Sequence, residues 1–110
     1  MRLGLWRHNS GLYFFKKVHP SMGRKMKCII FMSICANKFH GIRAALCGDC
    51  YSAEMTRKHN DANVLCLGGR VIGIELAKCI VDTWLSNEFI GSYHQNRLDK
   101  IAKVERGEDF

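Results

Sequence analysis

Hydrophobic and polar positions alternate in blocks most clearly between residues 41 and 73. The short apolar runs Ile42–Cys47 and Val64–Leu67 have the pattern of strands that are buried on both faces. The segment Tyr51–His59 between them has helical composition. A helix between two buried strands predicts a parallel crossover unit, and in such sheets ligands bind beyond the carboxyl ends of the strands. Polar residues lie near these ends or turns, at Gly48-Asp49, His59-Asn60 and Gly68-Gly69-Arg70.

Helices are predicted on both sides of this unit. Ser33–Lys38 has the pattern of the end of a helix, and Asp49 or Ser52 can cap the helix that follows the first strand. Ile74–Asn87 has apolar residues at three- and four-residue spacing, which predicts one broad buried face: Ala77, Ile80, Val81, Trp84 and Leu85. Tyr93–Glu105 carries a narrower stripe, which suits either a surface helix or a helix that packs on a partner chain: Leu98, Ile101 and Ala102.

The first 31 residues show no clean periodicity. Leu12–Phe15 and Cys28–Phe31 each suit a short strand, with a turn at Pro20 between them. The basic, acid-free composition also fits an organelle transit peptide or a segment that is not native to the domain. From the crossover unit we predict an α/β fold with parallel strands, with the organised part of the chain after residue 31.

Length and composition indicate one small domain. The chain has 110 residues, of which 47% are hydrophobic and 25% are charged. It has no run of about 18 apolar residues, so no transmembrane helix is expected. The six cysteines lie within apolar strand and helix patterns and no signal peptide precedes them, which favours a reduced cytoplasmic protein over a disulfide scaffold.

The net charge of +7 is concentrated at the front of the chain. Residues 1–48 carry nine Lys and Arg and no acid, whereas residues 49–110 carry eight Lys and Arg against ten Asp and Glu. A basic arm can bind nucleic acid, but these bases are scattered and no nucleic-acid motif accompanies them. We therefore interpret the basic segment as an extension and expect neither a nucleic-acid nor a membrane partner.

Several side chains are candidates for chemistry. Cys47-Gly48-Asp49-Cys50 is a single CxxC, which without a second pair is only a weak zinc signal. Its place at a helix start after a strand also suits a redox pair, and the plainer interpretation is two small residues at a strand end. His59 can donate a proton near neutral pH, or it can serve only as a capping residue. Arg70, His94 and Arg97 are candidate phosphate ligands, because a guanidinium forks onto phosphate oxygens; taken singly, each also suits solvated surface.

Four motifs together resemble the C-terminal half of type B ribose-5-phosphate isomerases, a family that also includes the galactose-6-phosphate isomerase subunits. The resemblance runs from about Met32 to Glu105, and its motifs are SICANKFHGIRAALC, YSAEMTRKHNDANVL, GGRVIGIELAKCIVDTWL and HQNRLDKI. It divides the chain into an unmatched basic segment, residues 1–31, and the C-terminal part of a sugar-phosphate isomerase domain, residues 32–110.

The resemblance implies an open Rossmann-like sandwich and a homodimer with sites shared across the interface. It implies interconversion of ribose 5-phosphate and ribulose 5-phosphate, without metal or organic cofactor. In this family an acid histidine, here His59, opens the sugar ring, and a base then moves a proton between C2 and C1 through an enediolate. Asn60 matches a sugar-binding position, and Arg70 and Arg97 match arginines that hold the phosphate or sugar hydroxyls.

The chain departs from the family pattern before Met32. Nothing in residues 1–31 matches the family's Asp-His pair, and the place of its oxyanion-stabilising glycine loop, Met26–Met32, contains no glycine. The family's cysteine base corresponds to Met26, and the glutamate base of some members corresponds to Met32. One further arginine near the phosphate is replaced by Tyr93, beside His94.

We hypothesise that residues 1–31 derive from a truncated or frame-shifted gene, since the resemblance ends abruptly at Met32. The sequence then predicts an isomerase domain that keeps an acid and a phosphate clamp but lacks a base, with activity near background. The alternative is a non-catalytic remnant that binds sugar phosphates or dimerises.

Overall fold

The computed structural model describes residues 29–109, in which five short loops connect two strands and several helices. The elements in chain order are α1 (Ile29–Ala36), β1 (Ala44–Cys47), α2 (Cys50–Asn60), β2 (Val64–Leu67), α3 (Ile74–Ser86), the 3₁₀ turn η2 (Ser92–His94) and α4 (Gln95–Glu105). The predicted strand Leu12–Phe15 and the predicted turn at Pro20 lie outside the described residues.

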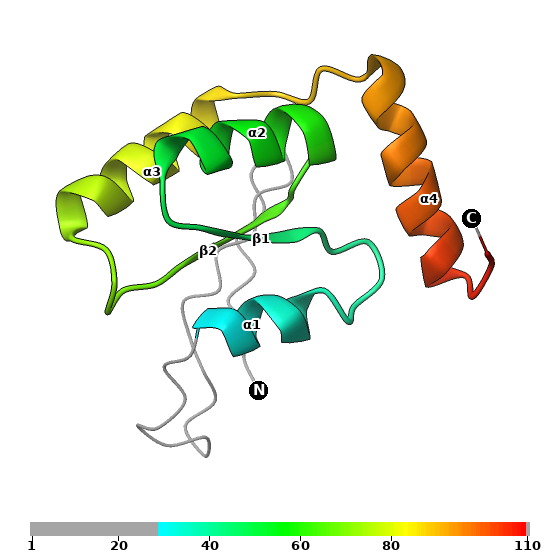
Figure 1. Cartoon of the computed structure of the whole chain (residues 1–110), viewed down its shortest axis with the longest axis horizontal. Helices are drawn as coiled ribbons and strands as arrows, with labels where there is room; N and C mark the ends of the chain where they lie inside the picture. Colours follow the sequence, from blue (N-terminus) through cyan, green and yellow to red (C-terminus); the bar gives the residue numbers. More distant parts are fainter. Residues whose placement is uncertain (1–28, 110) are drawn as a thin grey trace.

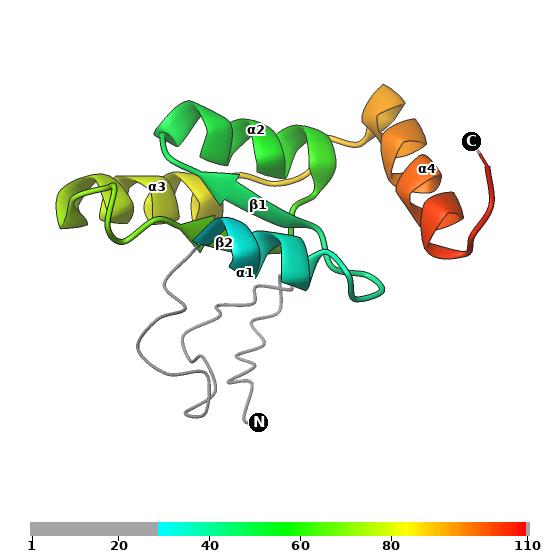
Figure 2. The same cartoon turned by 60° about the horizontal axis from the view of Figure 1, so that its bottom comes forward.

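The two strands form a parallel sheet, with Ala44 opposite Val64 and Cys47 opposite Leu67. Helices α2 and α3 pack together on one face and α1 contacts the other face, so the described chain has three layers (Figure 1). The same layers are visible after rotation, with α4 to one side of them (Figure 2). This arrangement confirms the predicted α/β fold and its parallel crossover.

The core lies between the sheet and helices α2 and α3. Its buried members are Cys47, Ala53, Ala62, Leu65, Ile80 and Trp84. The predicted apolar face of α3 is confirmed at Ile80 and Trp84, which are fully buried, whereas Leu85 keeps 47% of its surface exposed. Apolar burial of this kind supplies most of the stability of an amphipathic helix.

Two predictions at the start of the domain are wrong. Ile29–Phe31 form the first turn of α1 and not a strand, because the apolar run continues directly into the predicted helix end. β1 begins at Ala44 and is not buried on both faces, since Leu46 is 43% exposed. Within the described residues β1 pairs only with β2. The short helix α1 does not fully cover the face of β1 that carries Leu46.

The outer edge of β1 is closed at Ala44 by a side chain. The amide of Asn37 accepts a hydrogen bond from the Ala44 N–H at 2.7 Å and donates one to the Ala44 carbonyl at 2.9 Å. The preceding carbonyl, that of Arg43, accepts instead from the N–H groups of Asn63 and Val64 on the β2 side. The Asn37 side chain therefore occupies the place of a neighbouring strand.

The ends of α2 have specific caps. Asp49 Oδ1 accepts from the Ser52 N–H at 2.7 Å, so Asp49 is the cap, and these hydrogen bonds lower the pKa of Asp49. At the other end Asp61 adopts the left-handed conformation with φ 44°, and its N–H donates to the Arg57 carbonyl. The cap at Asp61 turns the chain from α2 towards β2.

Candidate functional site

The last turn of α2 is held by a network of charged side chains. Asp61 accepts from Arg57 Nη1 at 3.1 Å through one carboxylate oxygen and from Arg43 Nη2 at 2.9 Å through the other. Arg43 Nε also donates to the Asp61 carbonyl at 2.9 Å. The turn that contains His59 and Asn60 is therefore fixed from two sides.

His59 stacks on His94, which comes from a distant part of the sequence. The two ring centroids are 4.1 Å apart with an interplanar angle of 14°, and the Tyr93 ring contacts His94 at 4.0 Å. His94 is only 2% exposed, and neither of its ring nitrogens has a hydrogen-bond partner among the described residues. Polar atoms buried in this way are normally hydrogen-bonded, so the two unpaired nitrogens set His94 apart from an ordinary core residue.

Charge and burial keep His94 neutral. Burial lowers the pKa of His94, and the electrostatic influence of His59 and Arg97 lowers it further. A neutral imidazole offers one N–H donor and one acceptor, a pair that suits a hydroxyl or a phosphate oxygen. His94 is also the N-cap residue of α4, where backbone N–H groups favour an anion.

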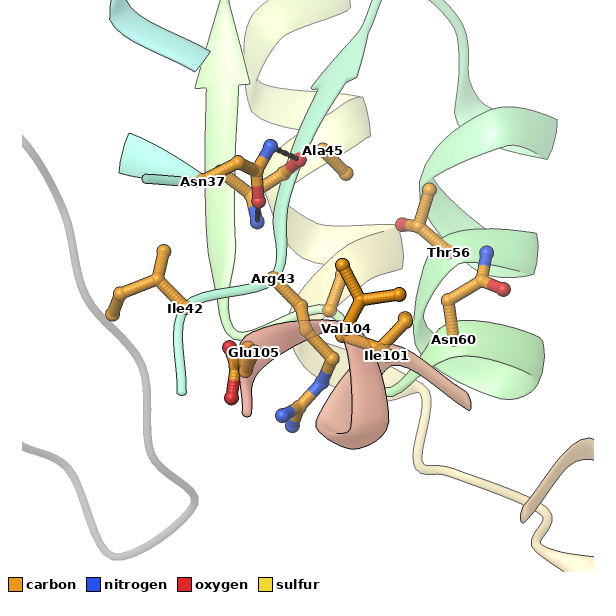
Figure 3. A pocket seen from close by; sticks show the side chains of 11 residues that line it. Asn37, Ile42, Arg43, Ala45, Thr56, Asn60, Ile101, Val104 and Glu105 are labelled. Atoms are coloured by element: carbon orange, nitrogen blue, oxygen red, sulfur yellow. Dashed lines mark hydrogen bonds between the residues drawn. The ribbon is translucent and has the colours of Figure 1, made fainter. Parts of the chain in front are cut away.

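Asn60 lies at a neighbouring cavity of about 360 Å³ between β1, the last turn of α2 and α4 (Figure 3). Its walls include the apolar side chains Ile42, Ile101 and Val104, and polar groups of Arg43 and Glu105 lie at its lower end in the view. Glu105 accepts a hydrogen bond from the Gly41 N–H at 2.8 Å, which ties the end of α4 to the approach of β1. His59 does not line this cavity.

The two candidate arginines lie at opposite ends of the sheet. Arg97 is in the first turn of α4, close enough to His94 to lower its pKa. Arg70 is exposed in the turn after β2, where the N–H groups of Val71 and Ile72 donate to the Gly68 carbonyl. A four-residue strand of roughly 13 Å separates that turn from the last turn of α2. The fold thus brings His59, His94 and Arg97 together, with Asn60 beside them, and leaves Arg70 apart.

The cysteines form no metal site among residues 29–109. Cys47 is buried at the end of β1, and burial raises the pKa of its thiol; Cys50 begins α2. The structure contains no group of three or more His, Cys, Asp or Glu side chains that could hold a metal ion in the described part of the chain. The structure thus places the CxxC at the junction of β1 and α2.

No proton acceptor of the expected kind stands in α1. Met32, at the place of the glutamate base, is partly buried in this helix, whose residues include no carboxylate. Met26, at the place of the cysteine base, lies outside the described residues.

No helix within residues 29–109 is long and apolar enough to cross a membrane.

Arg57 is a residue of this region that the sequence did not single out. It is 7% exposed and donates to the carbonyls of Ala62 and Asn87 as well as to Asp61. The available signal was its four-residue spacing from Asp61, a spacing that allows an ion pair at a helix end. Its contacts beyond α2 depend on the tertiary fold and have no signature in the sequence.

Comparison with known proteins agrees with the fold and with the motifs. The sequence model of a family described as Ribose/Galactose Isomerase matches residues 30–101. The chain is 53% identical over 75 residues to "Ribose-5-phosphate isomerase B" of Escherichia coli (strain K12), covering 68% of this chain and 50% of that protein. It is 52% identical over 79 residues to "D-erythrulose-4-phosphate isomerase" of Pectobacterium atrosepticum, covering 72% and 52%.

A solved structure leads to the same result. The ribose-5-phosphate isomerase B of Clostridium thermocellum superposes with a TM-score of 0.72 at 52% identity, over 74% of this chain and 55% of that one. The chain therefore spans about half the length of the relatives that it matches.

Proposed function

Because the chain belongs to the ribose/galactose isomerase family, we propose that it provides the ring-opening acid and the phosphate clamp of a ribose-5-phosphate isomerase site. The observation that carries this proposal is the contact of His59 with the buried His94, 4.1 Å apart, beside Arg97. An acid candidate and phosphate-binding candidates from two distant segments meet at one place. A sugar phosphate presents a ring oxygen and a phosphate to such a site.

In the proposed reaction, protonated His59 donates its proton to the ring oxygen of ribose 5-phosphate, and the C1 hydroxyl loses one as the ring opens. A base must then remove the proton from C2 and return it to C1 through an enediolate, which yields ribulose 5-phosphate. No electron leaves the sugar, so the reaction needs no redox cofactor. The places of the family's bases hold Met26 and Met32, whose side chains cannot accept a proton. We therefore propose turnover near background for this chain.

Arg97 and the N-terminal amides of α4 would hold the phosphate, with His94 donating or accepting at one of its oxygens. Asn60 would bind a sugar hydroxyl through its amide. Arg70 lies too far from His59 to join the same site. We propose that it acts in the site of a second copy, in a homodimer that shares its sites across the interface.

Two features support a homodimer and a reducing environment. Apolar side chains in the turn after β2 and in the first turn of α3 are exposed, among them Val71, Ile74 and Leu76, and a partner chain would cover part of this surface. The free thiols at the cysteines of residues 29–109 are compatible with the reducing cytoplasm that we propose for this chain. Sedimentation of the purified chain would show whether it is a dimer.

The test uses the purified 110-residue chain with ribose 5-phosphate as the probe. We expect NMR signals of the His59 and His94 rings to shift on titration, and ribulose 5-phosphate to form no faster than without protein. The variant His59→Gln should keep the binding, since it retains a polar side chain at the place of the acid. Erythrulose 4-phosphate belongs in the same titration, because one relative of similar identity is named for it.

Absence of any shift at the two histidines would reject the proposed site. Rapid formation of ribulose 5-phosphate would instead reject the proposal of near-background turnover, and would require a base elsewhere in the chain.

A further inference from the structure

Arg57 is the buried cation nearest to the candidate acid, and its guanidinium contacts three separate segments. Nη1 donates to the Ala62 carbonyl at 2.7 Å, just before β2, and to Asp61 Oδ1 at 3.1 Å. Nε donates to the Asn87 carbonyl at 3.3 Å, just after α3. The guanidinium carbon lies 5.1 Å from the centre of the Trp84 ring. One side chain therefore joins α2, the start of β2 and the end of α3.

The contact with Asn87 extends to the histidine pair. The connection between α3 and η2 is fixed to α2 at Asn87, through Arg57, and again at Ile90, whose N–H donates to the Lys58 carbonyl at 3.2 Å. Four residues later the chain reaches His94, which is buried against His59. His59 itself follows Arg57 by two residues on the same helix. Both rings of the stack are thus positioned by segments that Arg57 holds together.

We propose that Arg57 is a positioning residue that holds the His59 ring against the His94 ring and thereby orients the acid. This inference rests on the proposed role of His59. Lysine cannot replace the guanidinium, because an ammonium group lacks the planar fork that reaches Asp61, Ala62 and Asn87 at once. The charge remains compensated by Asp61, which Arg43 holds from the other side.

The test is NMR of the full 110-residue chain with labelled histidines, without substrate. The wild-type chain should show a ring-to-ring Overhauser effect between His59 and His94, and His94 should titrate below an ordinary histidine. In Arg57→Lys we expect loss of that Overhauser effect and an upward shift of the His94 titration, towards about 6.5. Circular dichroism reports whether the variant remains folded.

Two controls separate positioning from stability. Lys58→Met removes a cation from the same helical turn, where the Lys58 side chain pairs with Glu54, and should leave the stack intact. Ile80→Val weakens the core at a fully buried residue and should also leave the stack intact, even though it lowers stability.

The proposal is wrong if folded Arg57→Lys keeps both signatures, or if the wild-type chain lacks the Overhauser effect. If Arg57→Lys does not fold, Asp61→Asn decides the question. This variant removes the charge partner of Arg57, so a weakened Overhauser effect supports the proposal and an unchanged one overturns it. No substrate enters the measurement, so failure of the chain to bind ribose 5-phosphate would count only against the proposed function.

Discussion

The two ends of the β1–β2 sheet are built in different ways. At the amino ends of the strands, Arg43, Arg57 and Asp61 connect segments that lie 18 to 30 residues apart in the sequence. At the carboxyl ends, the hydrogen bonds join residues three or four apart, as between Asp49 and Ser52 or in the turn after Gly68. The stack of His59 on the buried His94 lies at the end with the long-range contacts, while Arg70 is exposed at the other end.

The site that we propose therefore lies at the end of the sheet opposite to the one that the general rule for parallel sheets predicts. Ligands usually bind beyond the carboxyl ends of the strands, where loops converge. Within the described residues, only the amino end has buried, unpartnered polar atoms beside a cation, at His94 and Arg97. A site needs side chains that the fold holds in place, and here the long-range network supplies that rigidity.

The largest expected effect is a loss of folding stability when the aromatic ring that Arg57 contacts is removed. Trp84 is 1% exposed, and Trp84→Ala should destabilise the chain by about 3–5 kcal/mol, through lost burial and the cavity left behind. Urea unfolding followed by circular dichroism measures this loss. Leu85→Ala, at the adjacent and largely exposed residue, is the matched control and should cost much less. Equal losses in the two variants would show that the amino-end packing carries no special weight.

The second expected effect is on the affinity for ribose 5-phosphate, and it compares Arg97 with Arg70. Arg97→Met should weaken binding of ribose 5-phosphate by about tenfold, equivalent to roughly 1.4 kcal/mol, because it removes a charge-assisted hydrogen bond. Arg70→Met should leave binding to a monomeric chain within about twofold. Calorimetry at one fixed salt concentration gives both values, with chain association measured in parallel. A larger loss for Arg70→Met would place the phosphate at the carboxyl end instead.

The smallest expected effect is the contribution of His94 to the pH dependence of folding stability. The pKa of His94 is lowered in the folded chain, so the unfolded chain binds a proton more readily. Stability should therefore be unaffected by His94 above its ordinary pKa of about 6.5 and should fall as the pH drops from there through the folded value. His94→Gln should flatten the urea midpoint curve below about pH 6.5. An unchanged slope in the variant would assign the pH dependence to other groups.

Local pattern was sufficient for most elements of the described chain. The strand Val64–Leu67 and the helix Ile74–Asn87 were predicted within one residue of β2 and α3, because their burial follows simple periodicity. The pattern predicts a buried Leu46, but this side chain is exposed, because its burial depends on which elements cover the outer face of β1. The separation of Arg70 from His59 and the role of Arg57 depend equally on tertiary contacts. The proposed boundary between residues 31 and 32 stays a prediction.

The side-chain clamp of Asn37 on Ala44 has a consequence for how the chain behaves at high concentration. An open strand edge is a template on which another chain can extend the sheet, the first step towards fibrils. Here a growing sheet would have to displace two hydrogen bonds at Ala44, each contributing about 0.5–1.5 kcal/mol, before it could pair along β1. The Asn37 amide would therefore raise the barrier to self-templated assembly along the four-residue strand β1.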